Sequence, residues 1–313
     1  MGQSYRRACV TGGAGFIGSH LVRALLESGL EVCVLDNVSV GRKQNVAPGA
    51  SLFVGDILDS DSVTSAMAGC DIVFHLAARV AIRSSFEFVV SDATTNFAGT
   101  ASVLRAAQQS GSVRKFIAAS SMAVYSDAPG PAPINEEFAT NPVSPYGISK
   151  LAMERLVHVM CAAASIESVV LRLFNTYGPG QAYSPYVGVV TIFVNRLLNG
   201  ENPTIYGDGE QSRDFVQVHD VVRGFLRAMD APVTGETFNI GTGVATSVNS
   251  VLRTLNTLFG TSFPGEHVPP VSGELRYSVA DIGKARHKLG FEPDHRFTTS
   301  IGSVVREIQS IAS

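Results

Sequence analysis

Tyr146 and Lys150 are the two residues of this 313-residue chain whose types and spacing most directly suggest chemistry. They lie four residues apart in the segment SPYGISK, which opens a stretch with helical periodicity. Residues at this spacing are neighbours on one face of a helix. An ammonium group beside a phenol favours the phenolate and lowers the pKa of the phenol. The pair could therefore form a general base.

A glycine-rich segment near the N-terminus, CVTGGAGFIGSHL, could bind the pyrophosphate of a dinucleotide. It follows a candidate strand, opens a candidate helix and places Gly12, Gly15 and Gly18 at regular spacing. Glycines let the backbone approach a phosphate, and a helix N-terminus favours its negative charge. Asp36 ends the next candidate strand. A carboxylate there can bind the adenosine ribose and repel a 2′-phosphate, which predicts NAD rather than NADP.

Other strand ends in the first half of the chain indicate the same cofactor site. Asp56 and Ile57 follow one candidate strand and could contact the adenine, while residues 75–79 would line the route to the nicotinamide. His75 ends an apolar strand. We expect it to be a hydrogen-bonded structural histidine rather than a catalytic base.

The elements that must position these residues alternate along the first half of the chain. Apolar segments of strand length stand at 8–12, 31–36, 51–56, 71–77, 115–120 and 168–174. Segments with helical periodicity lie between them, at 16–29, 61–69, 94–111 and 144–165. This alternation predicts βαβ units and a parallel sheet covered on both faces. The expected fold is α/β, a Rossmann-type doubly wound sheet with a smaller, interleaved α/β substrate domain.

The character of the chain changes after Phe174, where a loop rich in Gly, Pro and Tyr precedes shorter elements. We expect an NAD-binding domain at 1–175, with returning segments near 213–220 and 237–241. Residues 176–313 would form the substrate-binding domain. Ligands of such sheets bind outside the carboxyl ends of the strands, which here is the cleft between the two domains.

Composition argues against several other classes of protein. The net charge is −3 and no block of Lys or Arg occurs, so no nucleic-acid partner is expected. The apolar runs are too short to cross a membrane and no signal-peptide core is present, so we expect a cytosolic protein. The cysteines lack C-x-x-C spacing, which predicts buried reduced thiols and no metal site or disulfide. They are Cys9, Cys33, Cys70 and Cys161.

A series of segments resembles, in order along nearly the whole chain, the extended short-chain dehydrogenase/reductase family and, within it, the nucleotide-sugar 4-epimerases of the UDP-galactose 4-epimerase type. The segments are TGGAGFIGSHL, LDN, GDI, FHLAA, SSMAVY, SPYGISK, LRLFNTYGPG, YGDGEQSRDFVQVHD, FNIGTG and ADIGKARHKLGFEP. The resemblance implies bound NAD and a nucleotide-sugar substrate, expected to be UDP-linked.

The resemblance also implies roles for individual residues. Tyr146 would be the catalytic base, Lys150 its partner, and Ser121 would hydrogen-bond the same substrate oxygen. Tyr146 and Lys150 would also contact the cofactor, together with Gly12, Gly15, Phe16, Ile17, Gly18, Asp36, Asn37, Asp56, Ile57, Leu76, Ala77, Ala78, Asn96 and Phe174. Ser121 and Tyr146 would contact the substrate, together with Arg83, Asn175, Val189, Val190, Tyr206, Arg213, Arg276 and Ser278.

Three positions depart from the family's pattern. The lysine that some epimerases carry after HLAA is absent, and Arg79 and Val80 occupy that stretch. Val271 stands where a diphosphate-binding arginine is common, so Arg276 is expected to replace it. Ala98 replaces a second asparagine, which leaves Asn96 as the polar candidate.

Three reactions can follow oxidation of the sugar at C4 in this family: re-reduction on the other face, which is epimerisation, loss of water (4,6-dehydration), or net reduction by NADPH. The dehydratases carry Asp-Glu after their active-site Thr, whereas this chain has Met122 and Ala123, which supply neither acid nor base. Asp36 disfavours NADPH. Epimerisation through a transient 4-keto intermediate is therefore predicted. A non-catalytic NAD-sensing regulator is the alternative from another class, disfavoured by the intact catalytic residues.

The identity of the sugar stays open. Ser278 leaves space where a bulky residue would exclude N-acetylated sugars. Arg83 could pair with a uronate carboxylate, or it could be a surface or phosphate-facing arginine. UDP-linked hexoses, N-acetylhexosamines and uronates all fit.

Finally, we expect a homodimer through the two long helices at 94–110 and 145–164. The second helix has more apolar residues than one sheet contact buries, and large apolar patches usually mark interfaces. These residues are Leu151, Leu156, Val159, Met160 and Ala163. The resemblance implies the same pairing, a four-helix bundle across a two-fold axis. The alternative is that the loop at 127–141 covers these residues within one chain.

Overall fold

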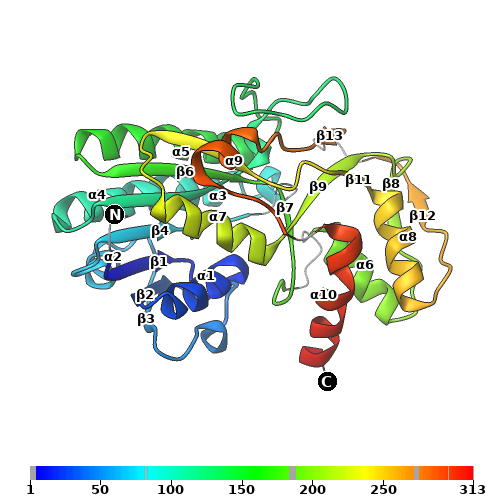
Figure 1. Cartoon of the computed structure of the whole chain (residues 1–313), viewed down its shortest axis with the longest axis horizontal. Coiled ribbons are helices and arrows are strands. Elements are labelled where there is room, and N and C mark those ends of the chain that lie inside the picture. Colours follow the sequence, from blue (N-terminus) through cyan, green and yellow to red (C-terminus); the bar gives the residue numbers. More distant parts are fainter. Residues whose placement is uncertain are drawn as a thin grey trace.

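A seven-stranded parallel sheet forms the larger of two lobes in the computed structural model, which describes residues 5–80, 82, 84–182, 188–270, 275–294 and 296–312 (Figure 1). The strand order is β10-β6-β5-β4-β1-β2-β3. The bounds are β1 (Arg7–Thr11), β2 (Glu31–Asp36), β3 (Ser51–Val54), β4 (Ile72–His75), β5 (Lys115–Ser121), β6 (Glu167–Leu173) and β10 (Glu236–Ile240). The predicted doubly wound sheet is confirmed.

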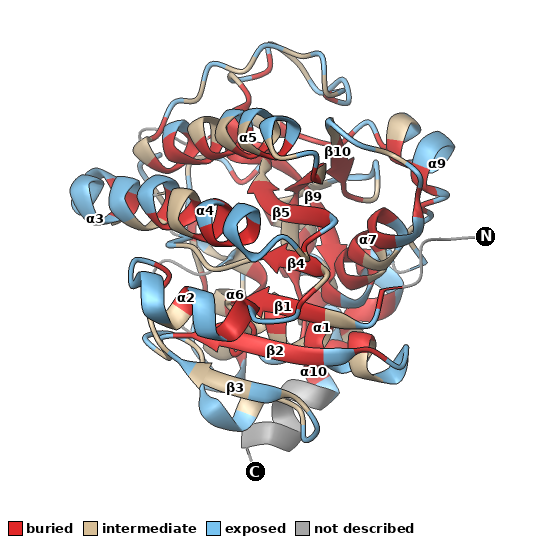
Figure 2. Ribbon diagram, turned by 90° about the vertical axis from the view of Figure 1, so that its left-hand side faces the viewer, coloured by how far each residue is buried: buried red, intermediate tan, exposed pale blue. Residues whose placement is uncertain are grey.

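Helices cover both faces of this sheet and enclose two separate apolar cores (Figure 2). One face carries α1 (Phe16–Glu27), α7 (Val218–Asp230) and α9 (Gly283–Leu289). The other carries α2 (Ser60–Met67), α4 (Thr100–Ser110) and α5 (Pro145–Ala163). Strands between two helical layers must be apolar on both sides, which explains the continuous apolar runs of the sequence.

Local signals set the ends of the helices. Ser144 caps α5 by accepting a hydrogen bond from the backbone N–H of Gly147 at 3.1 Å, and Pro145 occupies the first turn. Gly111 ends α4 in the left-handed conformation, with φ of 64°, as predicted. The single helix predicted over 94–111 is wrong in detail, because a π-helical turn, η3 (Thr94–Gly99), precedes α4 and follows the short α3 (Val89–Ala93). Three 3₁₀ turns complete this lobe: η1 (Lys43–Asn45), η2 (Ser84–Phe86) and η4 (Met122–Val124).

The smaller lobe is built around β9 (Ser212–Gln217), which pairs with β7 (Asn175–Tyr177), β11 (Ala245–Ser247) and β13 (Tyr277–Ser278). A separate parallel pair joins β8 (Thr204–Tyr206) to β12 (Glu266–Val268). Its helices are α6 (Val189–Leu198), α8 (Val248–Phe259) and α10 (Phe297–Ala312), with a third apolar core among them. The chain returns to the large sheet at β10, whereas β9 stays in the small sheet and the following α7 packs against α1.

The four cysteines are buried and free, as predicted. Within the described part of the chain, no helix is both long enough and apolar enough to cross a membrane.

Candidate active site

The carboxyl ends of the parallel strands bring the predicted residues to one edge of the large sheet. Gly12 follows β1, Asp36 ends β2 and Leu76 follows β4. Ser121 ends β5 and Phe174 follows β6. These positions are far apart in the sequence, and the strand register alone aligns them. These predicted site residues therefore lie at the edge where such folds bind ligands.

The turn between β1 and α1 has a shape that only glycine permits. Gly12 has a φ of +75°, and a Cβ there would lie 2.7 Å from the backbone nitrogen of Ala77. A Cβ on Gly18 would lie 2.1 Å from the carbonyl oxygen of Gly12. Gly15 stands at the N-cap of α1, and no side chain caps the helix, which begins with Phe16 and Ile17. The uncapped N–H groups can receive an anionic group, so the cradle fits the pyrophosphate of NAD.

Polar side chains at the ends of β2 and β3 form the adenosine side of the cradle. The Asp36 carboxylate accepts hydrogen bonds from the backbone N–H groups of Ala14 at 2.9 Å and Val38 at 2.8 Å. The side-chain amide of Asn37 donates to Asp56 at 2.8 Å. These bonds fix both carboxylates in place beside the glycine turn. Their free lone pairs suit the hydroxyl groups of a ribose.

His75 plays a structural part, as predicted. Its Nδ1 lies 2.7 Å from the hydroxyl of Thr11, and its Nε2 lies 2.8 Å from that of Thr100. Burial, assisted by the charge of Lys150, lowers the pKa of His75 to about 3. With both ring nitrogens occupied and no charge at neutral pH, it is not suited to catalytic proton transfer. Leu76, Ala77 and Ala78 continue from it along the edge of the sheet.

Tyr146, Lys150 and Ser121 meet where α5 crosses the end of β5. The Tyr146 phenol hydrogen-bonds the Ser121 hydroxyl, which also accepts from the backbone N–H of Ala123 at 3.2 Å. Lys150 donates from Nζ to the carbonyl oxygen of Ala119 at 2.9 Å. All three residues of the predicted catalytic set thus lie at one junction of strand and helix.

Burial dominates the electrostatics of this pair. It raises the pKa of Tyr146 to about 12, with the hydrogen bond from Ser121 opposing the change and the charge of Asp92 adding to it. It lowers the pKa of Lys150 to about 8, against the charges of Asp92 and Glu154. The protein without its cofactor therefore does not show the predicted lowering of the Tyr146 pKa by Lys150. Desolvation of the buried phenol is the largest cause of the shift, and Lys150, whose ammonium group donates to the carbonyl oxygen of Ala119, is not among the causes.

Asn96 is occupied by protein groups. Its Oδ1 accepts from the backbone N–H of Arg79 at 2.9 Å, and its Nδ2 donates to the Arg79 carbonyl oxygen at 3.1 Å. It therefore holds the chain segment that follows β4, and its contact with the cofactor stays a prediction. Phe174 is buried, with its backbone N–H bonded to Ile240 of β10.

On the substrate side, two predicted residues carry buried polar atoms without a hydrogen-bond partner. They are Oδ1 of Asn175 and Oγ of Ser278. Such atoms are costly unless a ligand satisfies them. Register places Ser278 beside Arg213 of β9, whose Nη1 donates to the Ser212 carbonyl oxygen at 2.9 Å. These groups line one part of the small sheet.

The remaining predicted substrate residues have a competing partner, lie at the ends of helices and strands, or fall outside the described residues. Arg276 forms a bidentate ion pair with Asp208, at 2.7 and 2.8 Å, so binding a diphosphate would require exchange of that partner. Val189 and Val190 begin α6, and Tyr206 ends β8 with its side chain partly exposed. Arg83 and Val271 lie outside the described residues.

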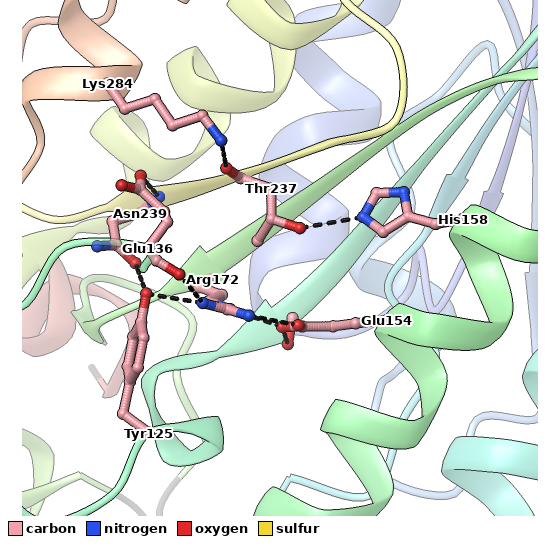
Figure 3. A network of polar contacts seen from close by, with 9 residues as sticks. Tyr125, Glu136, Glu154, His158, Arg172, Thr237, Asn239 and Lys284 are labelled. Carbon is pink, nitrogen blue, oxygen red and sulfur yellow. Dashed lines mark hydrogen bonds and ion pairs between the residues drawn. The ribbon is translucent and has the colours of Figure 1, made fainter. Parts of the chain in front are cut away.

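A buried ion pair behind the catalytic junction was not predicted from the sequence. Arg172 of β6 binds Glu154 of α5 through two hydrogen bonds, at 2.9 and 2.7 Å, and donates to the Tyr125 hydroxyl at 2.9 Å (Figure 3). Ser120, the neighbour of Ser121, donates to Glu154 at 2.5 Å. The sequence feature that could have indicated this ion pair is Arg172, a charged residue inside the otherwise apolar strand segment 168–174.

Comparison with known proteins identifies the family. Residues 8–241 match the model of the NAD dependent epimerase/dehydratase family. The chain is 35% identical over 305 residues to a UDP-glucose 4-epimerase of Mycolicibacterium smegmatis, covering 96% of this chain and 97% of that protein. It is 33% identical over 318 residues to a UDP-N-acetyl-alpha-D-glucosaminuronate decarboxylase of Bacillus cytotoxicus, covering 98% of both.

Solved structures agree with this assignment. A UDP-glucose 4-epimerase of Thermotoga maritima with UDP-glucose superimposes with a TM-score of 0.94 at 37% identity, covering 98% of this chain and 100% of that one. The Thermus thermophilus UDP-glucose 4-epimerase in complex with NAD gives 0.91 at 35% identity, covering 97% and 99%. The chain belongs to the NAD dependent epimerase/dehydratase family, with NAD as its cofactor.

Proposed function

We propose that the protein is a nucleotide-sugar 4-epimerase that inverts C4 of a UDP-linked sugar through a transient 4-keto intermediate. The main support for the proposal is that Ser121, Tyr146 and Lys150 lie together at one junction of strand and helix. The buried turn that follows Ser121 contains Met122 and Ala123. A dehydratase needs an acid and a base in that turn, and these two side chains provide neither.

The residues of the chain divide the chemistry between them. Tyr146 takes the proton of the sugar 4-hydroxyl and returns it to the same oxygen when the opposite face of C4 is reduced, while Ser121 hydrogen-bonds that oxygen. Lys150 holds the cofactor ribose and supplies positive charge. Gly12, Asp36 and their neighbours bind NAD, which when bound accepts and returns the hydride.

The substrate class rests on the small lobe and on the relatives, which act on or bind UDP-sugars. Asn175 and Arg213 would bind the diphosphate, and the small, unpartnered Ser278 leaves room beside the sugar. Hexoses, N-acetylhexosamines and uronates stay within the proposal. We also propose the division into an NAD-binding domain at 1–175 and a substrate domain at 176–313, and a cytosolic location.

A panel of UDP- and dTDP-sugars, incubated with the protein and NAD and followed by NMR, tests the function. The expected product is the C4 epimer, formed without net consumption of reduced cofactor. Stoichiometric oxidation of NADH or NADPH, a 4-keto-6-deoxy product or a decarboxylated sugar would overturn the proposal. Tyr146→Phe is the matched inactive control.

We further propose a homodimer through α4 and α5. Val159 of α5 is 67% exposed, and Ile148 on the same helix is 58% exposed. A groove between the two helices is lined by Ala101, Arg105, Gln108, Gln109 and Met160. Loop residues 136–140 line a pocket of about 510 Å³ together with Glu154 and His158, and the exposure of Val159 argues against the alternative in which the loop at 127–141 covers this face. The outward-facing parts of α4 and α5 are a mixture of pale blue and tan in Figure 2, that is, exposed and half-buried.

A further inference from the structure

Asp92 is a buried carboxylate to which the proposed mechanism gives no part. It lies in α3 with only 2% of its surface exposed. Its Oδ1 accepts a hydrogen bond from the Ser149 hydroxyl at 2.7 Å and a longer one from Nδ2 of Asn96 at 3.2 Å. Asn96 and Ser149 also bond each other, at 3.0 Å. Both donors are neutral, so these bonds orient the carboxylate without cancelling its charge.

This carboxylate is directed at the segment of α5 that carries the catalytic pair. Ser149 directly precedes Lys150, and its hydroxyl oxygen lies 2.9 Å from the backbone carbonyl oxygen of Tyr146. α3 packs against α5 along this segment. The charge of Asp92 acts to raise the pKa of both Tyr146 and Lys150.

The other ionisable groups near the pair are ion-paired, neutral or held against a ring. Glu154, one turn beyond Lys150, pairs with the bidentate Arg172 (Figure 3), although its charge still acts to raise the pKa of Lys150. His75 of β4 is buried with a pKa of about 3 and is neutral. The guanidinium of Arg79, on the segment after β4, lies over the Phe88 ring at 5.7 Å from its centroid.

We propose that Asp92 is an electrostatic positioning residue for the catalytic pair: held by Ser149 and Asn96, its carboxylate keeps the buried Lys150 ammonium charged and sets the pH range over which Tyr146 can act as a base. The catalytic meaning of this inference rests on the proposed epimerase function. The effect of the buried Asp92 charge on the titration of Tyr146 and Lys150 does not depend on that function.

The sign of the effect distinguishes this role from a structural one. A neutral residue at position 92 removes a charge that favours protonation of both groups, so both should lose their protons more easily. Each limb of the pH profile that reports Tyr146 or Lys150 should therefore move to lower pH. The expected shift is about one pH unit, the low end of the effect of a neighbouring charge. Loss of packing alone would change the height of the profile or the stability, not the position of both limbs.

The primary experiment measures the phenol directly and needs no turnover. The ultraviolet absorbance of tyrosinate is titrated in the wild type and in Tyr146→Phe, with and without NAD, and the difference reports Tyr146 alone. The same difference is taken in an Asp92→Asn background. We expect the Tyr146 titration to fall by about one pH unit in Asp92→Asn and to stay near the wild-type value in Asp92→Glu, which keeps the charge.

Asp220→Asn is the matched control, because Asp220 is also a buried carboxylate but lies on α7, where it pairs with Arg223. It should leave the Tyr146 titration unchanged. An unchanged titration in folded Asp92→Asn would overturn the inference, as would an equal shift in Asp92→Glu. If Asp92→Asn does not fold, Asp92→Ser is the second neutral variant with the same expectation.

The pH dependence of kcat then separates the two proposals. If no nucleotide sugar is turned over but the phenol titration shifts, the proposed function fails and the role of Asp92 stands. If epimerisation is observed and both limbs stay in place in Asp92→Asn, the role of Asp92 fails and the function stands.

Discussion

Replacing Glu154 with glutamine should lower the free energy of unfolding by about 3–5 kcal/mol, because it leaves the Arg172 guanidinium charged and unpaired inside the protein. The side chains of Arg172 and Glu154 are only 6% and 3% exposed. Burial acts to lower the pKa of Arg172, but the hydrogen bonds and charge of Glu154 outweigh it and raise that pKa above its ordinary value. Glutamine removes that support, but a guanidinium does not lose its proton in a protein, so the arginine stays charged and unpaired in the variant.

The structure allows the cost of the unpaired charge to be distinguished from the cost of lost packing. Glutamine has nearly the same shape as glutamate and can still accept from the Ser120 hydroxyl, which lies 2.5 Å from Oε1 of Glu154. The double variant Glu154→Gln/Arg172→Met removes both charges, so no uncompensated charge is left buried. It should therefore recover much of the stability lost in the single variant, less the hydrogen bond from Arg172 to Tyr125.

Urea denaturation followed by circular dichroism measures these differences. Glu201→Gln is the matched control, because Glu201 pairs with Arg196 at the surface with side chains 49% and 41% exposed. An exposed pair contributes about 0–1 kcal/mol. If Glu154→Gln lowers the free energy of unfolding by less than about 1 kcal/mol, as the control does, the Arg172–Glu154 pair behaves like an exposed ion pair and the reasoning is refuted.

Four further predictions follow from the site and the surface. Tyr146→Phe should reduce turnover by about 10²–10⁴-fold while leaving NAD binding intact, and retention of more than about a tenth of the wild-type rate would contradict the role of a general base. Asp36→Ser should narrow the preference for NAD over NADP in binding assays, and an unchanged ratio would place the discrimination elsewhere. The pKa of Lys150 falls from 10.5 to about 8 on folding, so the unfolded chain binds that proton more tightly. The stability of the wild type relative to Lys150→Met should therefore rise between about pH 8 and 10.5, and a flat difference would contradict the lowered pKa. Val159→Glu should convert a dimer into a monomer in sedimentation experiments, whereas a wild-type species near 33.1 kDa would refute the dimer itself.

Local sequence patterns determined most of the large lobe. The apolar run at 31–36 became β2 with the same bounds, because a strand buried on both faces needs only consecutive apolar residues. Ser144 and Pro145 fixed the start of α5 through bonds within one helical turn. Since alternating strands and helices give a parallel sheet, their carboxyl ends meet at one edge, and the sequence alone could place the glycine turn, Asp36 and Ser121 together.

The tertiary structure decided the electrostatics of that edge. From the sequence, the i, i+4 pair predicts that Lys150 lowers the pKa of Tyr146, but burial raises it to about 12. Burial depends on the sheet and the neighbouring helices, which no local pattern describes. Asp92 and Ser149 lie 57 positions apart in the chain and become hydrogen-bonded only when α3 packs against α5. Local spacing determines which side chains share a helix face, whereas only packing between distant segments determines which charges are desolvated and which ones balance them.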